Sequence, residues 1–234
     1  YRFMLNRKTI LQPGLKFGYA NRGVDFSKLV FNDQIESNSS TTLDVDAFKN
    51  ENVTYPDISG GILLYSETYW VSSSLNHINQ PNQSLISQES VSELPMKFTF
   101  QAGFNFSLSG GPVIKRLSDK TITTALHYEF QGEFDQFDAG AYYNHAPFVF
   151  GFWYRGIPGL KSYEPGYANN DAFIVLVGYS IPDRNLRVGY SYDVTVSRLA
   201  SNSGGAHEVS LIYEMASQRT KRKNRKFIVP CAKF

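Results

Sequence analysis

The amino-acid sequence predicts an all-β fold, a transmembrane β-barrel of antiparallel strands in up-and-down order. The first observation behind this prediction is the segment MKFTFQAGFNFSL at residues 96–108, in which apolar residues alternate with polar residues or glycine. Successive side chains of a strand point to opposite faces, so this segment has one apolar face, which includes four phenylalanines, and one polar face. Ordinary strands run for about 5–6 residues, whereas a strand that crosses a bilayer at a tilt needs about this length.

Composition and connection lengths favour the same fold. Aromatic residues make up 15% of the 234 residues, with 18 Phe and 15 Tyr, and such residues form the girdles of membrane barrels. Connection lengths alternate along the chain, with short ones at residues 6–9, 66–68, 144–146 and 182–185 and longer polar ones between them, like the periplasmic turns and extracellular loops of a barrel. The connector at residues 109–120 and the tight turn near Gly132 break this rule of length without changing the alternation of sides. A soluble β-sandwich with a polar outer face is the alternative, and the long strands with aromatic faces disfavour it.

Alternation of apolar and polar residues justifies each predicted strand in turn. The strands are expected around residues 1–5, 11–20, 58–64, 69–75, 96–108, 121–130, 134–143, 148–155, 173–180, 186–194 and 207–214. The segments 27–56, 77–95, 157–170 and 197–205 are expected to be long loops, and residues 109–120 a connector of intermediate length.

The predicted strand count has a consequence for the organisation of the chain. Roughly eleven strands are expected, and bacterial single-chain barrels have even numbers. We therefore expect residues 1–216 to be the C-terminal portion of a longer barrel of about fourteen strands, with about twelve as the alternative. Residues 217–234 are expected to form a basic C-terminal tail on the periplasmic side.

The sequence predicts no catalytic, cofactor or metal site, and therefore no enzyme. The four histidines show no metal-ligand spacing, and Cys231 is the single cysteine, expected to be a free thiol. A barrel hydrolase in which His77 or His127 acts with a serine is an alternative without a supporting nucleophile motif. A net charge of +2 implies no nucleic-acid partner.

The polar strand faces predict a candidate partner-binding lumen. The charged and amide side chains expected to point inward are Lys16, Lys97, Gln101, Asn105, Glu129, Arg187, Asp193 and Glu208. A lumen of mixed charge can bind a partner segment through ion pairs and hydrogen bonds, and long loops could contact the same partner. Alternatively, these side chains pair with one another.

Several blocks resemble the PorP/SprF family of outer-membrane proteins, which is linked to type IX secretion and gliding in Bacteroidota. The blocks are LQPGLKFGYANRGVDFSKLVFNDQI at residues 11–35, YPDISGGILLYSETYWVSSSLNHINQPNQSL at residues 55–85 and LRVGYSYDVTVSRLASNSGGAHEVSLIYE at residues 186–214. The ending PCAKF is similar to the ending of the family, with Ala232 where proline is usual.

The resemblance implies a non-enzymatic barrel in the outer membrane of a Gram-negative cell. It implies that the barrel binds a type IX-secreted protein, such as the C-terminal domain of a surface adhesin, and anchors it at the cell surface. Another branch of the family connects to periplasmic components of the secretion and gliding motor. A porin-like channel with an open lumen is a further alternative.

Overall fold

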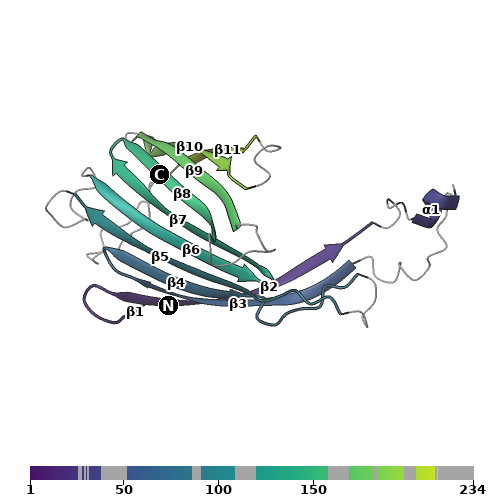
Figure 1. The fold of residues 1–234 in the computed structure, drawn as a ribbon. Coiled ribbons are helices and arrows are strands. Elements are labelled where there is room, and N and C mark those ends of the chain that lie inside the picture. The colour runs from purple at the N-terminus through teal and green to yellow at the C-terminus, as the bar shows by residue number, and fades with distance from the viewer. Residues whose placement is uncertain are drawn as a thin grey trace. The chain divides into compact units, whose positions relative to one another are not determined.

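A single antiparallel β-sheet dominates the computed structural model, which describes residues 1–25, 28, 30, 32–37, 52–85, 91–108, 120–157, 169–181, 184–197, 204–213 and 215. The strands are β1 (Phe3–Met4), β2 (Ile10–Gly23), β3 (Asn52–Tyr65), β4 (Tyr69–Asn76), β5 (Lys97–Ser107), β6 (Thr121–Gln131), β7 (Phe134–His145), β8 (Phe148–Ile157), β9 (Asn169–Ile181), β10 (Leu186–Thr195) and β11 (Ala206–Tyr213). They are hydrogen-bonded in sequence order, from β1 to β11 (Figure 1). This order confirms the predicted all-β, up-and-down arrangement.

The sheet is open in the part of the chain that the structure describes, with β1 and β11 at its two edges. The chain divides into two compact units. The larger unit comprises Tyr1–Pro13, Ile62–Ser73 and Thr99–Phe234, and the smaller unit comprises Gly14–Gly61 and Ser74–Phe98. The larger unit contains all of β6 to β11, which lie side by side in a curved sheet (Figure 1).

The observed strands differ from the predicted ones mainly at their polar ends. β3 begins at Asn52 rather than near Ile58, and β9 begins at Asn169 rather than near Phe173. The added residues do not continue the apolar alternation of the predicted strands, since the positions in phase with Ile58 are Asn52, Thr54 and Pro56, but they can still pair with a neighbouring strand. Asn21 Nδ2, for example, donates a hydrogen bond of 2.7 Å to Thr54 Oγ1 across the β2–β3 pair.

Two segments predicted as irregular loops contain local structure. A six-residue helix, α1 (Asn32–Ser37), lies in the first, and Asn32 Nδ2 donates a hydrogen bond to Glu36 Oε1 one turn later. In the second, the backbone N–H of Gln83 donates to Ser92 O, and Asn82 forms an isolated bridge with Glu93. Asn and Glu side chains and backbone bonds of this kind carry no periodic signal in a sequence.

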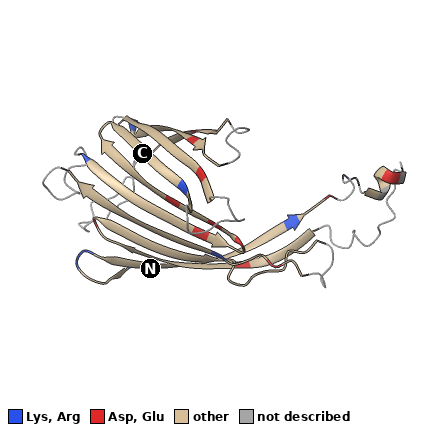
Figure 2. Ribbon diagram, in the orientation of Figure 1, with Lys and Arg blue, Asp and Glu red and all other residues tan. Residues whose placement is uncertain are grey.

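One face of the sheet in the larger unit, here called the apolar face, is exposed and almost wholly apolar. Cross-strand pairing places Phe150, Val177, Tyr190 and Val209 in one row across β8 to β11, and each is more than 40% exposed. These strands carry few charged residues (Figure 2). An exposed apolar surface of this extent is typical of a membrane barrel wall.

The described residues contain no helix with the length and apolar character needed to cross a membrane.

Three aromatic side chains of the opposite, polar face lie directly over glycines of the neighbouring strand. The indole of Trp70 occupies the space where a side chain at Gly103 would be, and the indole of Trp153 does the same at Gly140. Tyr142 likewise contacts the site of a Cβ at Gly151, at 2.8 Å. Because the glycines leave this space free, the three rings lie against the sheet instead of standing away from it.

Replacing Gly103 with alanine is expected to lower the free energy of unfolding by about 1–3 kcal/mol, because the new methyl group overlaps the Trp70 ring. The urea midpoint of the refolded protein, followed by tryptophan fluorescence, measures this change. Gly14→Ala is the matched control, since no atom lies within 4 Å of a Cβ built there. Equal midpoints for the two variants would contradict the close packing of Trp70 on Gly103.

In the smaller unit, the turn after β4 is held against β3 by side-chain contacts. His77 Nδ1 lies 2.9 Å from Asp57 Oδ1, and Asn79 Nδ2 donates to the carbonyl oxygen of Pro56 at 2.8 Å. The backbone N–H of Ile58 in turn donates to Asn79 Oδ1. These contacts give a structural role to the polar residues of the block at 55–85.

Candidate functional site

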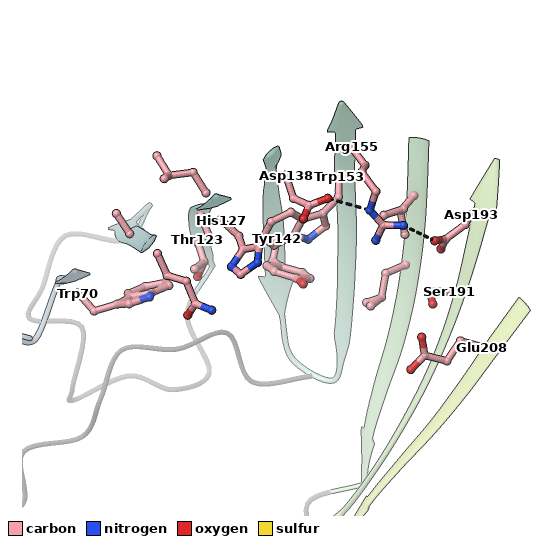
Figure 3. Close-up of a pocket in the computed structure, with 16 residues that line it drawn as sticks. Trp70, Thr123, His127, Asp138, Tyr142, Trp153, Arg155, Ser191, Asp193 and Glu208 are labelled. Carbon is pink, nitrogen blue, oxygen red and sulfur yellow. Dashed lines mark hydrogen bonds and ion pairs between the residues drawn. The ribbon is translucent and has the colours of Figure 1, made fainter. Parts of the chain in front are cut away.

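The polar face of the larger unit contains an open cleft of about 490 Å³. Residues that are paired across neighbouring strands form rows in its wall. One row consists of Thr123, Tyr142, Gly151, Leu176, Ser191 and Glu208, from β6 to β11. The next row includes Gly140, Trp153, Ile174 and Asp193, and the third includes His127, Asp138 and Arg155. Figure 3 shows these side chains between Trp70 at one end and Glu208 at the other.

Arg155 is the centre of an ion-pair network that joins several strands. Its Nε lies 2.9 Å from Asp138 Oδ1 on β7, and its Nη1 lies 3.5 Å from Asp193 Oδ2 on β10 (Figure 3). Asp171 Oδ2 on β9 is more distant, at 3.9 Å from the same nitrogen. Gln136 Nε2 donates a hydrogen bond of 2.7 Å to the second oxygen of Asp138, so both oxygens of this carboxylate have partners.

Two further polar contacts order the cleft wall on β5 and β6. Thr123, which is only 3% exposed, donates from Oγ1 to Asn105 Oδ1 at 2.6 Å. His127 Nε2 lies 3.3 Å from Glu129 Oε2, two residues further along the same strand face. These contacts hold the side chains that surround the cleft in fixed positions.

The cleft brings together three of the eight side chains expected in the lumen, namely Gln101, Asp193 and Glu208. Asn105 and Glu129 belong to the same unit and contact the cleft-lining residues Thr123 and His127. Arg187 is half-buried on β10, close to the turn before that strand. Lys16 on β2 and Lys97 at the start of β5 belong to the smaller unit and are not among the residues that line the cleft.

Sequence reasoning did not single out Asp138, Arg155, Trp70, Tyr142 or Trp153. Arg155 alternates with the phenylalanines of β8, and this parity alone assigns it to the polar face. The pairing of Arg155 with Asp138 and Asp193 had no signal, because it depends on the register of separate strands. The packing of the aromatic rings over glycines depends on the register between strands in the same way.

The histidines named for a hydrolase both have carboxylate partners. His77 contacts Asp57 and His127 contacts Glu129. Within the described ranges, the hydrogen bonds that these two histidines make go to carboxylates and not to serine hydroxyls. In the same ranges, no group of three or more His, Cys, Asp or Glu side chains is arranged to hold a metal ion.

No curated protein and no solved structure matches the chain. A family model described as "Type IX secretion system membrane protein PorP/SprF" matches residues 1–213, which is most of the sequence and includes every described strand. The chain therefore belongs to the PorP/SprF family of type IX secretion system membrane proteins.

Proposed function

We propose that this protein is a non-enzymatic outer-membrane barrel that binds a type IX-secreted protein and anchors it at the cell surface. The bound part is the C-terminal domain of the secreted protein, which is a surface adhesin. The apolar face contacts outer-membrane lipid, and the polar face surrounds the bound segment. The basic residues 217–234, which lie outside the described part of the chain, extend into the periplasm.

The observation that carries this proposal is the cleft on the polar face of the larger unit. The strands from β4 to β11 all contribute side chains to its wall, and the Arg155 network and the Asn105–Thr123 hydrogen bond hold several of these side chains in place. A site of fixed geometry loses little side-chain entropy when a partner binds, which favours affinity. Family membership supports the choice of partner, since the family is a component of type IX secretion.

Affinity capture from native outer membranes tests the proposal. We expect the tagged protein, extracted in mild detergent, to retain one large secreted protein in a one-to-one ratio, identified by mass spectrometry. A matched sample that contains an unrelated tagged barrel controls for non-specific retention of secreted proteins.

Other outcomes would replace the proposed role. Capture of periplasmic motor components instead would assign the protein to the secretion and gliding apparatus. A protein that retains neither class of partner but conducts ions in planar bilayers would be a porin-like channel, and the anchoring role would be wrong.

A further inference from the structure

The charges that line the cleft do not balance. Three carboxylates, those of Asp138, Asp193 and Glu208, face one guanidinium, that of Arg155. Arg155 contacts Asp138 and Asp193, whereas Glu208 is exposed and its side chain forms no ion pair or hydrogen bond with the other described residues. The cleft therefore has a net charge of −2 when His127 is neutral, and its unpaired carboxylate lies at the β11 end.

The aromatic residues of the cleft add a second, independent preference for a cation. Because Trp70 and Trp153 lie over Gly103 and Gly140, their rings rest against the sheet. Both indoles also line the cleft, so a group bound in the cleft can contact them. The faces of aromatic rings carry negative potential and attract ammonium and guanidinium groups.

The positions of the carboxylates favour an organic cation over a metal ion. Asp193 and Glu208 come from adjacent strands but from different rows of the register, and Asp138 lies three strands away from Asp193 in the sheet order. Neighbouring strands are about 4.8 Å apart, so these oxygens are spread along the cleft. A calcium ion needs six or more oxygens at about 2.3–2.6 Å, whereas an extended basic segment can contact carboxylates one after another.

We propose that the cleft binds a lysine- or arginine-bearing extended segment of the secreted partner, with Glu208 and Asp193 contacting its cationic groups and Trp70 stacking on one of them. This inference rests on the proposed function, because it names the chemistry of the segment that the barrel retains. Charge complementarity with the cleft is the reason to assign a basic rather than an acidic segment. Arg155 positions Asp193 and is not itself a contact for the cation.

Binding of a defined peptide by the full chain in detergent tests the site. The probe is N-acetyl-tetra-arginine amide, and the same peptide built from citrulline, which has a similar shape without the charge, is the comparison. We expect isothermal titration calorimetry to show a higher affinity for the arginine peptide than for the citrulline peptide. The affinity for the arginine peptide is expected to fall as the salt concentration rises. Equal affinity for the two peptides would overturn the proposal.

A pair of charge reversals locates the binding to the cleft. Glu208→Arg is expected to lower the affinity for the arginine peptide about tenfold or more, since it replaces an attraction with a repulsion. Glu133→Arg makes the same change in charge at the exposed β6–β7 turn and is expected to leave affinity unchanged. Equal weakening by both would mean that overall charge, not the cleft, attracts the peptide.

A second pair examines the aromatic contribution. Trp70→Leu is expected to lower the affinity for the arginine peptide about threefold, in line with a cation–π contact at a partly exposed site. Phe106→Leu, on the apolar face of β5, is the control and is expected to have no effect. Unchanged affinity in Trp70→Leu would remove Trp70 from the site.

Capture of the secreted partner by the Glu208→Arg protein separates this inference from the proposed function. If the unmodified protein retains a secreted partner and Glu208→Arg does not, both stand. If both proteins retain it equally, the anchoring function stands and the basic-segment inference is wrong. If the unmodified protein retains none while the arginine peptide still binds at the cleft, the proposed function is wrong and the cleft is a cation site for another partner.

Discussion

Replacing Arg155 with methionine is expected to lower the free energy of unfolding by about 2–3 kcal/mol. The side chain of Asp138 is only 11% exposed, and it depends on Arg155 for charge compensation. Loss of one partner of a buried ion pair costs about 3–5 kcal/mol, and the 31% exposure of Arg155 reduces that figure. Urea titration of the refolded protein in detergent, followed by tryptophan fluorescence, measures the change.

Two further variants establish whether the loss comes from the uncompensated carboxylate. Arg184→Met removes an exposed arginine from the turn before β10 and is expected to change stability by less than about 0.5 kcal/mol. Adding Asp138→Asn to Arg155→Met is expected to recover part of the stability, because the neutral amide has a smaller desolvation cost. A double variant that is less stable than Arg155→Met alone would contradict this account.

Replacing Phe152 with arginine is expected to destabilise the folded state in a bilayer by about 2–4 kcal/mol, which is the cost of a basic side chain on the lipid face near the membrane midplane. Phe152 lies in the middle of β8 and is 53% exposed. It is paired across strands with Val175, and its ring stacks on Phe173 at a centroid distance of 5.7 Å. Folding into lipid vesicles, followed by the heat-dependent shift in gel mobility, measures the loss.

The same substitution on the other face is the control for Phe152. Ser191 is on the polar face of β10 and lines the cleft, so Ser191→Arg is expected to fold into vesicles as well as the unmodified protein. In detergent micelles, whose surface adapts to a charge, the defect of Phe152→Arg is expected to be smaller than in vesicles. Equal folding of both variants in vesicles would mean that the apolar face does not contact lipid.

The predicted strands and faces agree with the structure because they depend on local geometry. Alternation within residues 96–108 predicts a strand that the structure places at Lys97–Ser107, with Gln101 and Asn105 on one face and Phe104 and Phe106 on the other. A strand repeats every two residues whatever it pairs with, so a single segment is enough to reveal its faces. Polar strand ends, such as the start of β3 at Asn52, lack this signal.

Part of the candidate site follows from the same local rule. Asp193 and Glu208 were assigned inward by the parity of their own strands, and both line the cleft. Lys16 and Lys97 were assigned by the same rule but belong to the smaller unit. Parity gives the face of a residue, but it does not say how far along the barrel wall that residue lies.

The sequence by itself determined the fold class, the order of most strands along the chain and the faces of the segments in which apolar and polar residues alternate. The tertiary structure decided which side chains meet, including Arg155 with Asp138 and Asp193, and Trp70 with Gly103. These contacts depend on the register between separate strands, which turns and side-chain packing set together. The period of a strand is a local property of the backbone, whereas its register is a property of the whole sheet.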